Sequence, residues 1–163
     1  MIYGIHTSPF GECLLAMIGD KVCHLSFIDD SHAQAVTRLK QEWKHEVCTK
    51  DQIATQATFE QIWQSGKNIK PAVQVFLQGT PFQTKVWEEL LKIPFGKTIS
   101  YQEVARRIGN PKAVRAAASA IANNKISILV PCHRVIAKSG KIHKYRWGSE
   151  RKKAILDWEA KLI

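Results

Sequence analysis

The chain has 163 residues, of which 45% are hydrophobic and 23% charged, so it can bury a core and is not a disordered polypeptide. No apolar run has the length of a membrane span, no secretory leader is recognisable, and the four cysteines lack zinc-site spacing, so we expect a cytoplasmic protein with reduced thiols. Lys and Arg total 24 against 14 Asp and Glu, a net charge of +10.

The charge is unevenly distributed along the chain. Residues 1–77 hold 7 basic and 8 acidic side chains, whereas residues 78–163 hold 17 basic and 6 acidic ones. A basic half of this kind is typical of proteins that bind a polyanion such as nucleic acid, although an inert basic surface has the same composition. We expect two domains, residues 1–77 and residues 78–163.

Residues 1–77 predict a small antiparallel sheet with helices. Two strands are expected within residues 1–28, formed by the apolar runs 13–18 and 22–28 on either side of a Gly-Asp turn. Ser31 is a typical N-cap for a helix that reaches about residue 44. The other elements expected in this half are a helix at residues 54–64 and a strand at residues 73–77.

Residues 78–163 predict a mainly helical domain. Thr80 followed by Pro81 is a typical helix start, and Ser100 is a typical N-cap for a second helix at residues 101–108. A Gly-Asn-Pro break separates this helix from a third one at residues 112–122, which is the outline of a helix-turn-helix. A strand at residues 126–130 and a last helix capped by Ser149 are expected to follow.

The third helix is rich in alanine and carries one long cationic side chain, Arg115. Small side chains allow the backbone of a helix to approach a partner closely, but they also suit a helix that packs tightly in a core. The segment alone favours core packing. Together with the basic character of residues 78–163, contact with DNA becomes the better interpretation.

Cys132 is the candidate nucleophile, because it lies between Pro131 and two potential cations, His133 and Arg134. Nearby cations lower the pKa of a thiol, and the thiolate is the form that attacks carbon. In an extended segment His133 would point away from the sulfur, so a bridging water would have to carry the proton to it. Glu159 is the candidate partner for the second nitrogen of the imidazole. The pair alone does not distinguish a peptidase, an amidase, an alkyl acceptor or a buried structural cysteine.

Several motifs of the second half resemble the O6-alkylguanine-DNA alkyltransferases. The segments that carry the resemblance are residues 79–83, 86–87, 93–101 and, above all, the Pro-Cys-His-Arg motif within residues 131–136. Residues 123–125 and 145–148 resemble the bacterial adaptive-response type of this family. The resemblance covers roughly residues 78–160 and is much weaker before them.

The resemblance implies an α+β fold with two lobes. The first would be a ribonuclease-H-like supporting lobe with a small antiparallel sheet and helices. The second would be a mainly helical, winged-helix-like lobe with a helix-turn-helix, which binds DNA and accepts the alkyl group.

The resemblance also implies an activity and a set of catalytic residues. Cys132 would accept an alkyl group, chiefly methyl, from O6 of guanine and also from O4 of thymine, irreversibly and once per molecule. His133 would be the water-linked base, held by Glu159, and Asn124 would support the site through hydrogen bonds. Tyr101 would donate a proton or a hydrogen bond to N3 of guanine.

The implied partner is double-stranded DNA containing O6-alkylguanine, approached from the minor groove by a monomer while the damaged base is flipped out. Arg115 would enter the base stack. The other residues implied in DNA contact are Tyr101, Ala113, Ala116, Ser119 and Arg134. The residues implied in the substrate pocket are Tyr145, Arg146, Trp147 and Val135. No cofactor and no metal ion are expected.

The sequence departs from the family pattern near the pocket. Bulky residues, His143 and Lys144, precede Tyr145 where the family has a small one, Ser127 stands where Pro or Ala is common, and Trp147 would narrow the pocket. We therefore expect a preference for small groups such as methyl over benzyl. The alternatives are a damage-binding protein without transfer, a thiol hydrolase using Cys132 and His133, and a dimeric helix-turn-helix regulator.

Overall fold

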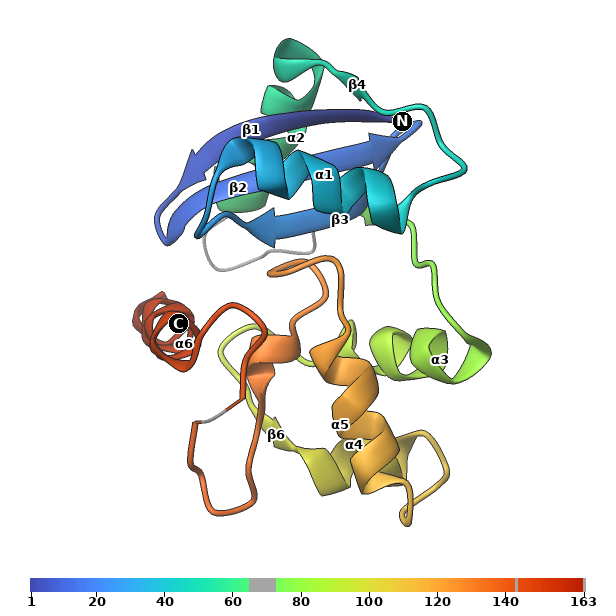
Figure 1. The fold of residues 1–163 in the computed structure, drawn as a ribbon. Helices are drawn as coiled ribbons and strands as arrows, with labels where there is room; N and C mark the ends of the chain where they lie inside the picture. The colour runs from blue at the N-terminus through green and yellow to red at the C-terminus, as the bar shows by residue number, and fades with distance from the viewer. Residues whose placement is uncertain (65–72, 143, 163) are drawn as a thin grey trace. The chain divides into compact units, whose positions relative to one another are not determined.

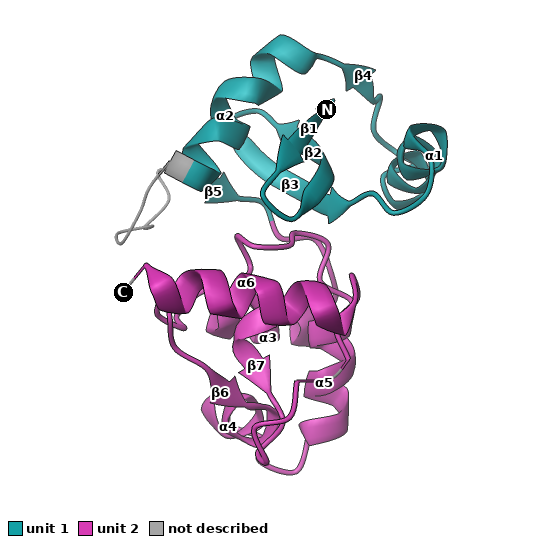
Figure 2. Ribbon diagram, turned by 90° about the vertical axis from the view of Figure 1, so that its left-hand side faces the viewer, with its two compact units in different colours: residues 1–76 teal, residues 77–163 magenta. Residues whose placement is uncertain are grey.

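The computed structural model describes residues 1–64, 73–142 and 144–162. The chain has a mixed α+β fold and divides into two compact units, Met1–Phe76 and Leu77–Ile163 (Figures 1 and 2). Among the described residues, no helix is long and apolar enough to cross a membrane.

Unit 1 is built around a five-stranded sheet with the order β4-β1-β2-β3-β5. The central strands β1 (Ile2–Ser8), β2 (Gly11–Ile18) and β3 (Lys21–Phe27) form an antiparallel meander. The short edge strands β4 (Thr49–Lys50) and β5 (Gln74–Val75) pair in parallel with β1 and β3. The sheet is therefore mixed at its edges rather than wholly antiparallel.

Two helices cover the opposite faces of this sheet, α1 (His32–Glu42) and α2 (Gln52–Gln64) (Figures 1 and 2). Because both faces are covered, five consecutive residues of β2 are buried instead of every second one. On the α1 face, the core cluster contains Leu14, Leu39 and Trp43.

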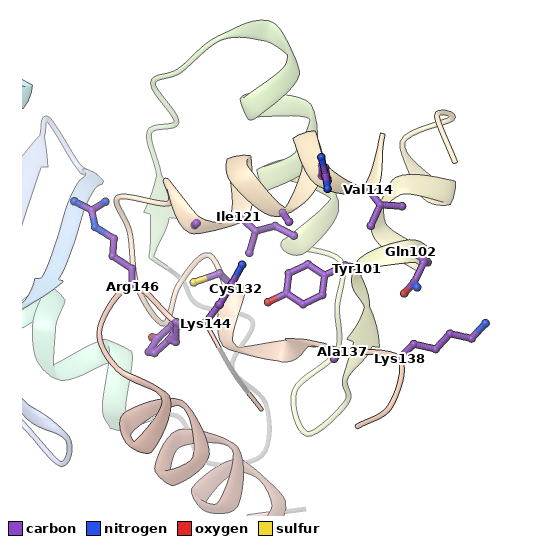
Figure 3. A pocket seen from close by; sticks show the side chains of 13 residues that line it. Tyr101, Gln102, Val114, Ile121, Cys132, Ala137, Lys138, Lys144 and Arg146 are labelled. Atoms are coloured by element: carbon purple, nitrogen blue, oxygen red, sulfur yellow. The ribbon is translucent and has the colours of Figure 1, made fainter. Parts of the chain in front are cut away.

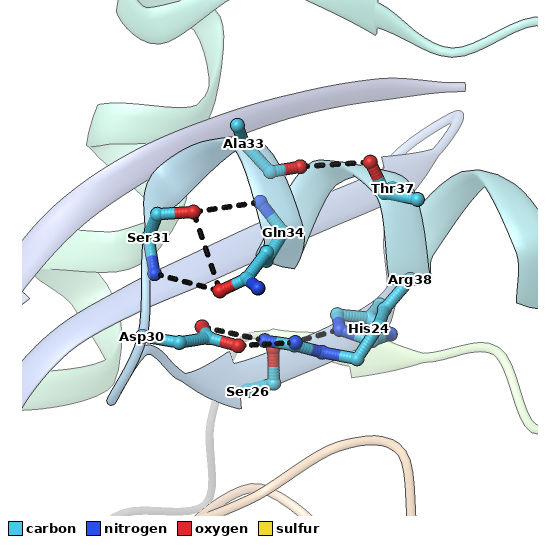
Figure 4. A network of polar contacts seen from close by, with 8 residues as sticks. All are labelled: His24, Ser26, Asp30, Ser31, Ala33, Gln34, Thr37 and Arg38. Carbon is cyan, nitrogen blue, oxygen red and sulfur yellow. Dashed lines mark hydrogen bonds and ion pairs between the residues drawn. The ribbon is translucent and has the colours of Figure 1, made fainter.

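The start of α1 is held by polar contacts near the end of β3 (Figure 4). Ser31 caps the helix by accepting a hydrogen bond from the Gln34 backbone amide, and the Gln34 side chain completes a capping box. Asp30 and Arg38 form a bidentate ion pair across the first turns. The predicted cap at Ser31 is confirmed.

The hairpin predicted from the apolar runs is confirmed as β2 and β3. The expectation of two strands within residues 1–28 is wrong, because β1 is a third one. The strand is difficult to recognise in the sequence because Gly4 interrupts its apolar pattern. A Cβ at this position would collide with the Thr55 hydroxyl of α2. The glycine is therefore required by helix packing and is not a turn signal.

Unit 2 is mainly helical and contains the expected helix-turn-helix as α4 and α5. Its elements are α3 (Pro81–Leu90), β6 (Ile99–Ser100), α4 (Tyr101–Arg107), α5 (Val114–Ala122), a 3₁₀ helix (Cys132–Arg134), β7 (Val135–Ile136) and α6 (Ser149–Lys161). The indole N–H of buried Trp87 donates to the carbonyl of Ala120 at 2.8 Å, which fixes α3 against α5.

The predicted helix starts are confirmed at two positions and wrong at a third. Thr80 forms a capping box with Gln83 at the start of α3, and Ser100 Oγ accepts from the backbone amide of α4 at 3.1 Å. The N-cap of α6 is Gly148 instead of Ser149, which is already the first helical residue. Gly148 has a φ of 98°, a conformation that favours glycine.

The strand predicted at residues 126–130 is wrong, because these described residues form a turn. The backbone amide of Leu129 donates to the carbonyl of Ser127 at 2.6 Å, and that of Val130 donates to the carbonyl of Ile126 at 3.2 Å. Ile128 has a φ of 66°, which is unusual for a β-branched residue. The apolar composition reflects burial of the turn and not a strand.

Candidate active site

Cys132 lies at the start of the 3₁₀ helix, so the chain turns at this residue and is not extended there. The chain then enters β7, which pairs in parallel with β6. Strand β6 leads directly into α4, whose first residue is Tyr101. As a result, Cys132 and Tyr101 line the same cavity.

Asn124 connects the end of α5 with the nucleophile. Its side-chain Nδ2 donates to Cys132 Sγ at 3.2 Å, to the carbonyl of Val130 at 2.9 Å and to that of Ile126 at 3.1 Å. Its Oδ1 accepts from the backbone amide of Ile126 at 3.0 Å. The whole side chain is buried. It therefore fixes the turn before Cys132 and also orients the thiol.

His133 and Glu159 form the buried pair that the sequence suggested. The distance from His133 Nε2 to Glu159 Oε1 is 2.7 Å, and both side chains are almost completely shielded from solvent. Among the described residues, His133 Nδ1 has no hydrogen-bond partner. If Nε2 carries the hydrogen that binds Glu159, Nδ1 is the nitrogen that can accept a proton.

Arg134 occupies a structural position in the unit. Its guanidinium binds both carboxylate oxygens of Glu159 and the carbonyl of Ile93, and it lies 5.4 Å from the centroid of the Phe95 ring. Only 12% of its side chain is exposed. The expected DNA contact of Arg134 is therefore not supported, because its hydrogen-bonding capacity is used inside the unit.

The electrostatic state of Cys132 differs from the sequence-based expectation. Burial raises the pKa of its thiol to about 11, while the hydrogen bond from Asn124 and the charges of Lys152 and Arg146 lower that pKa. The cations that act on the thiol are thus Lys152 and Arg146 and not the neighbours in sequence, His133 and Arg134. At neutral pH Cys132 is a protonated thiol that must lose its proton during the reaction.

Burial also affects the protonation of two titratable residues of the site, His133 and Tyr101. It lowers the pKa of His133, with Glu159 opposing the shift, so the imidazole is neutral at neutral pH. It raises the pKa of Tyr101, and the negative charge that Cys132 would carry raises it further. Tyr101 is therefore a hydrogen-bond donor, and His133 is a base.

The cavity in front of Cys132 has a volume of about 320 Å³ (Figure 3). Figure 3 shows the Tyr101 ring and the Cys132 sulfur together at its centre. The walls come from α4, α5, the 3₁₀ helix, residues 137–138 and residues 144–146. Arg115, Lys138, Lys144 and Arg146 are the cations among the lining residues.

The structure shows where most of the residues expected in the pocket and on the DNA lie. Tyr145 and Arg146 line the cavity, whereas Val135 and Trp147 do not, so Trp147 cannot narrow it directly. Val135 is completely buried, and Trp147 packs against Tyr145. His143 lies outside the described residues. On α5, the residues expected at the DNA are Ala113, half-buried at the N-cap, and the exposed Arg115, Ala116 and Ser119.

Sequence reasoning missed Lys152, a lysine of α6 with no solvent exposure. A signal was present, because Lys152, Ile155 and Glu159 follow one another at helical spacing and all three are buried on one face of α6. Gln102 and Lys138 were also missed as lining residues of the cavity. Among the described residues, no group of three or more His, Cys, Asp or Glu could hold a metal ion.

Comparisons with known proteins show the family to which the chain is related. A family model described as "6-O-methylguanine DNA methyltransferase, DNA binding domain" matches residues 81–161. The methylated-DNA–protein-cysteine methyltransferase of Methanosarcina mazei is 38% identical over 159 residues, which cover 98% of this chain and 97% of that protein. A crystal structure of Mycobacterium tuberculosis OGT in complex with DNA has a TM-score of 0.80 at 33% identity, and covers 99% of this chain and 94% of that one.

Some relatives are longer than this chain. The bifunctional transcriptional activator/DNA repair enzyme Ada of Escherichia coli is 38% identical over 160 residues, which cover 97% of this chain and 45% of Ada. The chain spans about half the length of the first relatives that it matches. The Methanosarcina relative is matched over nearly its full length. The chain therefore belongs to the family of methylated-DNA–protein-cysteine methyltransferases.

Proposed function

We propose that this protein repairs DNA by transferring an alkyl group, chiefly methyl, from O6 of guanine to Sγ of Cys132. The observation that carries the proposal is the arrangement at the cavity floor. Cys132 is buried there, and its Sγ accepts a hydrogen bond from Asn124 at 3.2 Å. It directly precedes His133, whose imidazole is hydrogen-bonded to Glu159 at 2.7 Å. This arrangement provides a nucleophile, a base and a group that orients the base.

In the proposed reaction, the proton of the Cys132 thiol passes to the neutral imidazole of His133. The thiolate attacks the alkyl carbon, the S–C bond forms and the C–O6 bond breaks, and the electron pair goes to the guanine. Tyr101, which keeps its proton at neutral pH, donates a hydrogen bond or a proton to N3 and makes the base a better leaving group. The product is a thioether, which water does not hydrolyse, so each molecule reacts once.

The alkyl carbon is hidden inside a stacked base pair, so the damaged base must leave the duplex to reach Cys132. We infer that α5 approaches the minor groove, since its outer face combines short side chains with Arg115, which also lines the cavity. Arg115 fills the space left by the flipped base, and basic side chains contact phosphates. The same pocket would accept O4-alkylthymine, and the protein acts as a monomer.

We also assign a role to each unit. Residues 78–163 carry the DNA-binding and alkyl-acceptor chemistry, and their helix-turn-helix supports a winged-helix-like architecture. Residues 1–77 form a supporting ribonuclease-H-like domain, an assignment supported by the covered mixed sheet. The hydrolase alternative is disfavoured, because a thiol hydrolase would not need the basic charge and because the chain belongs to a family of methyltransferases.

The test is a titration with excess duplex DNA that carries a labelled O6-methylguanine. Repair is expected to stop at one methyl group per protein molecule, because the thioether is a dead end. Cys132→Ser should transfer none, whereas Cys48→Ser, which changes a half-buried cysteine of unit 1, should still transfer one. Continued turnover beyond one equivalent, or transfer by Cys132→Ser, would rule out the proposal.

A further inference from the structure

Lys152 is a buried cation that the proposed reaction does not yet use. Its side chain has no solvent exposure, and Nζ donates to the carbonyl of Val135 at 2.6 Å. The same Nζ lies 5.9 Å from the centroid of the Tyr101 ring. Within the part of the chain that the structure describes, no carboxylate lies at ion-pair distance from it. Burial lowers its pKa.

An unpaired buried ammonium is expensive, because the protein gives up hydration without a compensating negative charge. Val135 provides one neutral acceptor, and a helix residue with an apolar side chain would fill the same space without this cost. A lysine at such a position is expected to contribute to the chemistry of the site rather than to the stability of the fold.

Lys152 is fixed against the turn that carries the nucleophile. The backbone amide of Val135 donates to the carbonyl of Cys132, and the carbonyl of Val135 accepts from Lys152. On the other side, the Tyr101 ring lies near the ammonium and lines the cavity together with Cys132. The ammonium is therefore linked through the Val135 backbone to the turn that carries Cys132, and it lies near the ring that shares the cavity with the thiol.

The other charged side chains near Lys152 and Cys132 already have hydrogen-bond or ion-pair partners. Glu159 from α6 forms an ion pair with Arg134 of the 3₁₀ helix and a hydrogen bond with the neutral imidazole of His133. Arg146, from the segment before α6, donates to the carbonyl of Asn124 and is exposed. The anion that Lys152 can face is the thiolate of Cys132, formed when the thiol loses its proton.

We propose that Lys152 is a positioning residue whose fixed positive charge stabilises the thiolate of Cys132 and so promotes attack on the alkyl group. The proton of the thiol goes to His133, and Lys152 keeps its own proton throughout. The charge of Lys152 also acts on the imidazolium of His133 and disfavours it. Among the charges that lower the pKa of Cys132, that of Lys152 comes first, whereas for the pKa of His133 it comes last of the causes.

The test compares two neighbouring lysines of α6 in the full-length protein. Lys152→Gln keeps a hydrogen-bond donor for Val135 but removes the charge. Lys153→Gln is the matched control, because Lys153 is exposed and forms a surface pair with Asp157. The first readout is the rate at which iodoacetamide modifies Cys132, followed by the mass of the Cys132 peptide from pH 7 to pH 10. It requires neither DNA nor methyl transfer.

Lys152→Gln is expected to slow modification of Cys132 on the order of tenfold at a given pH, which is a shift of the rate profile by about one pH unit. Its rate of methyl transfer from O6-methylguanine DNA should fall by a similar factor and recover as the pH rises. Its melting temperature should be unchanged or higher, since a buried unpaired charge is removed. Lys153→Gln should match the unaltered protein in all three measurements.

An unchanged pH profile of Cys132 in folded Lys152→Gln would overturn the inference. A loss of melting temperature with no shift of the profile would do the same, because it would assign a purely structural role to Lys152. The inference rests on the proposed function only for its effect on methyl transfer. If the unaltered protein transfers no methyl group, the proposed function fails, whereas the iodoacetamide profile still decides whether Lys152 acts on Cys132.

Discussion

Asn124 is the residue on which the geometry of Cys132 depends most directly. One buried amide binds the thiol and two carbonyls of the turn before it. A group with several buried partners is costly to remove, because each partner loses its hydrogen bond without gaining water.

Asn124→Ala is expected to abolish most methyl transfer and to destabilise the protein by about 1–3 kcal/mol. Asn123→Ala is the control, because Asn123 is exposed and its side chain donates to the carbonyl of Ser119 and to no other group in the part of the chain that the structure describes. Single-turnover kinetics and chemical unfolding measure the two effects. Equal behaviour of both variants would show that Asn124 does not organise the site.

Glu159 makes the stability of the protein depend on acid pH. Burial raises the pKa of its carboxyl, but hydrogen bonds and charges of His133 and Arg134 prevail and lower that pKa to about 2. A carboxyl with a depressed pKa stabilises the fold above its ordinary pKa of 4.5, and this contribution is lost as the pH falls towards 2.

Unfolding free energy measured by chemical denaturation should therefore fall by roughly 3 kcal/mol between pH 5 and pH 2 on account of Glu159. In Glu159→Gln, which cannot ionise, this part of the pH dependence should disappear. Glu150→Gln, in the exposed first turn of the same helix, should keep it. A Glu159→Gln profile parallel to that of the unaltered protein would contradict the assignment.

At the scale of secondary structure, the outer face of α5 is the expected DNA-binding surface. Ala116 lies in the first turn of this helix and is exposed. Ala116→Glu places a negative charge where a phosphate backbone is expected, while a carboxylate near a helix N-terminus does not destabilise the helix. We expect duplex affinity to fall at least roughly tenfold, with unfolding free energy within about 0.5 kcal/mol of the original.

Ala33→Glu is the matched control for this change, because Ala33 is exposed in the first turn of α1 in unit 1. Fluorescence anisotropy with labelled duplex DNA compares the two variants. A similar loss of affinity in both would mean that net charge alone, and not the α5 face, governs binding.

The elements that the sequence predicted are those with local signals. Ser31, Thr80 and Ser100 cap helices as expected, because capping depends on residues within one turn. The sequence of residues 126–130 could not distinguish a turn from a strand, since a short apolar run indicates burial and not backbone conformation. Strand β1 was missed because the glycine at position 4 is required by close packing against Thr55 of α2, a residue that is distant in the sequence.

At the scale of the whole molecule, the net charge of +10 predicts salt-sensitive DNA binding. Affinity for undamaged duplex DNA should fall by roughly a hundredfold or more between 50 and 200 mM salt, because each phosphate contact releases counterions. A titration at several salt concentrations gives the slope of log affinity against log salt. A flat response would argue against a phosphate-binding surface.

The candidate site was predictable where a motif carried it and not where the fold assembled it. Cys132, His133 and Glu159 followed from the motif and from the chemistry that a nucleophile requires. The inward position of Arg134 did not, because it depends on where α6 places Glu159. The raised pKa of the Cys132 thiol depends on burial, which the Pro-Cys-His-Arg sequence does not show.

The central claim is that Cys132 receives the alkyl group. The most direct measurement is the mass of the intact protein and of its Cys132 peptide after incubation with duplex DNA that contains one O6-methylguanine. The account predicts a gain of one methyl group, located on Cys132, together with restored guanine in the DNA. Tight binding without a mass gain, or a methyl group on another residue, would contradict it.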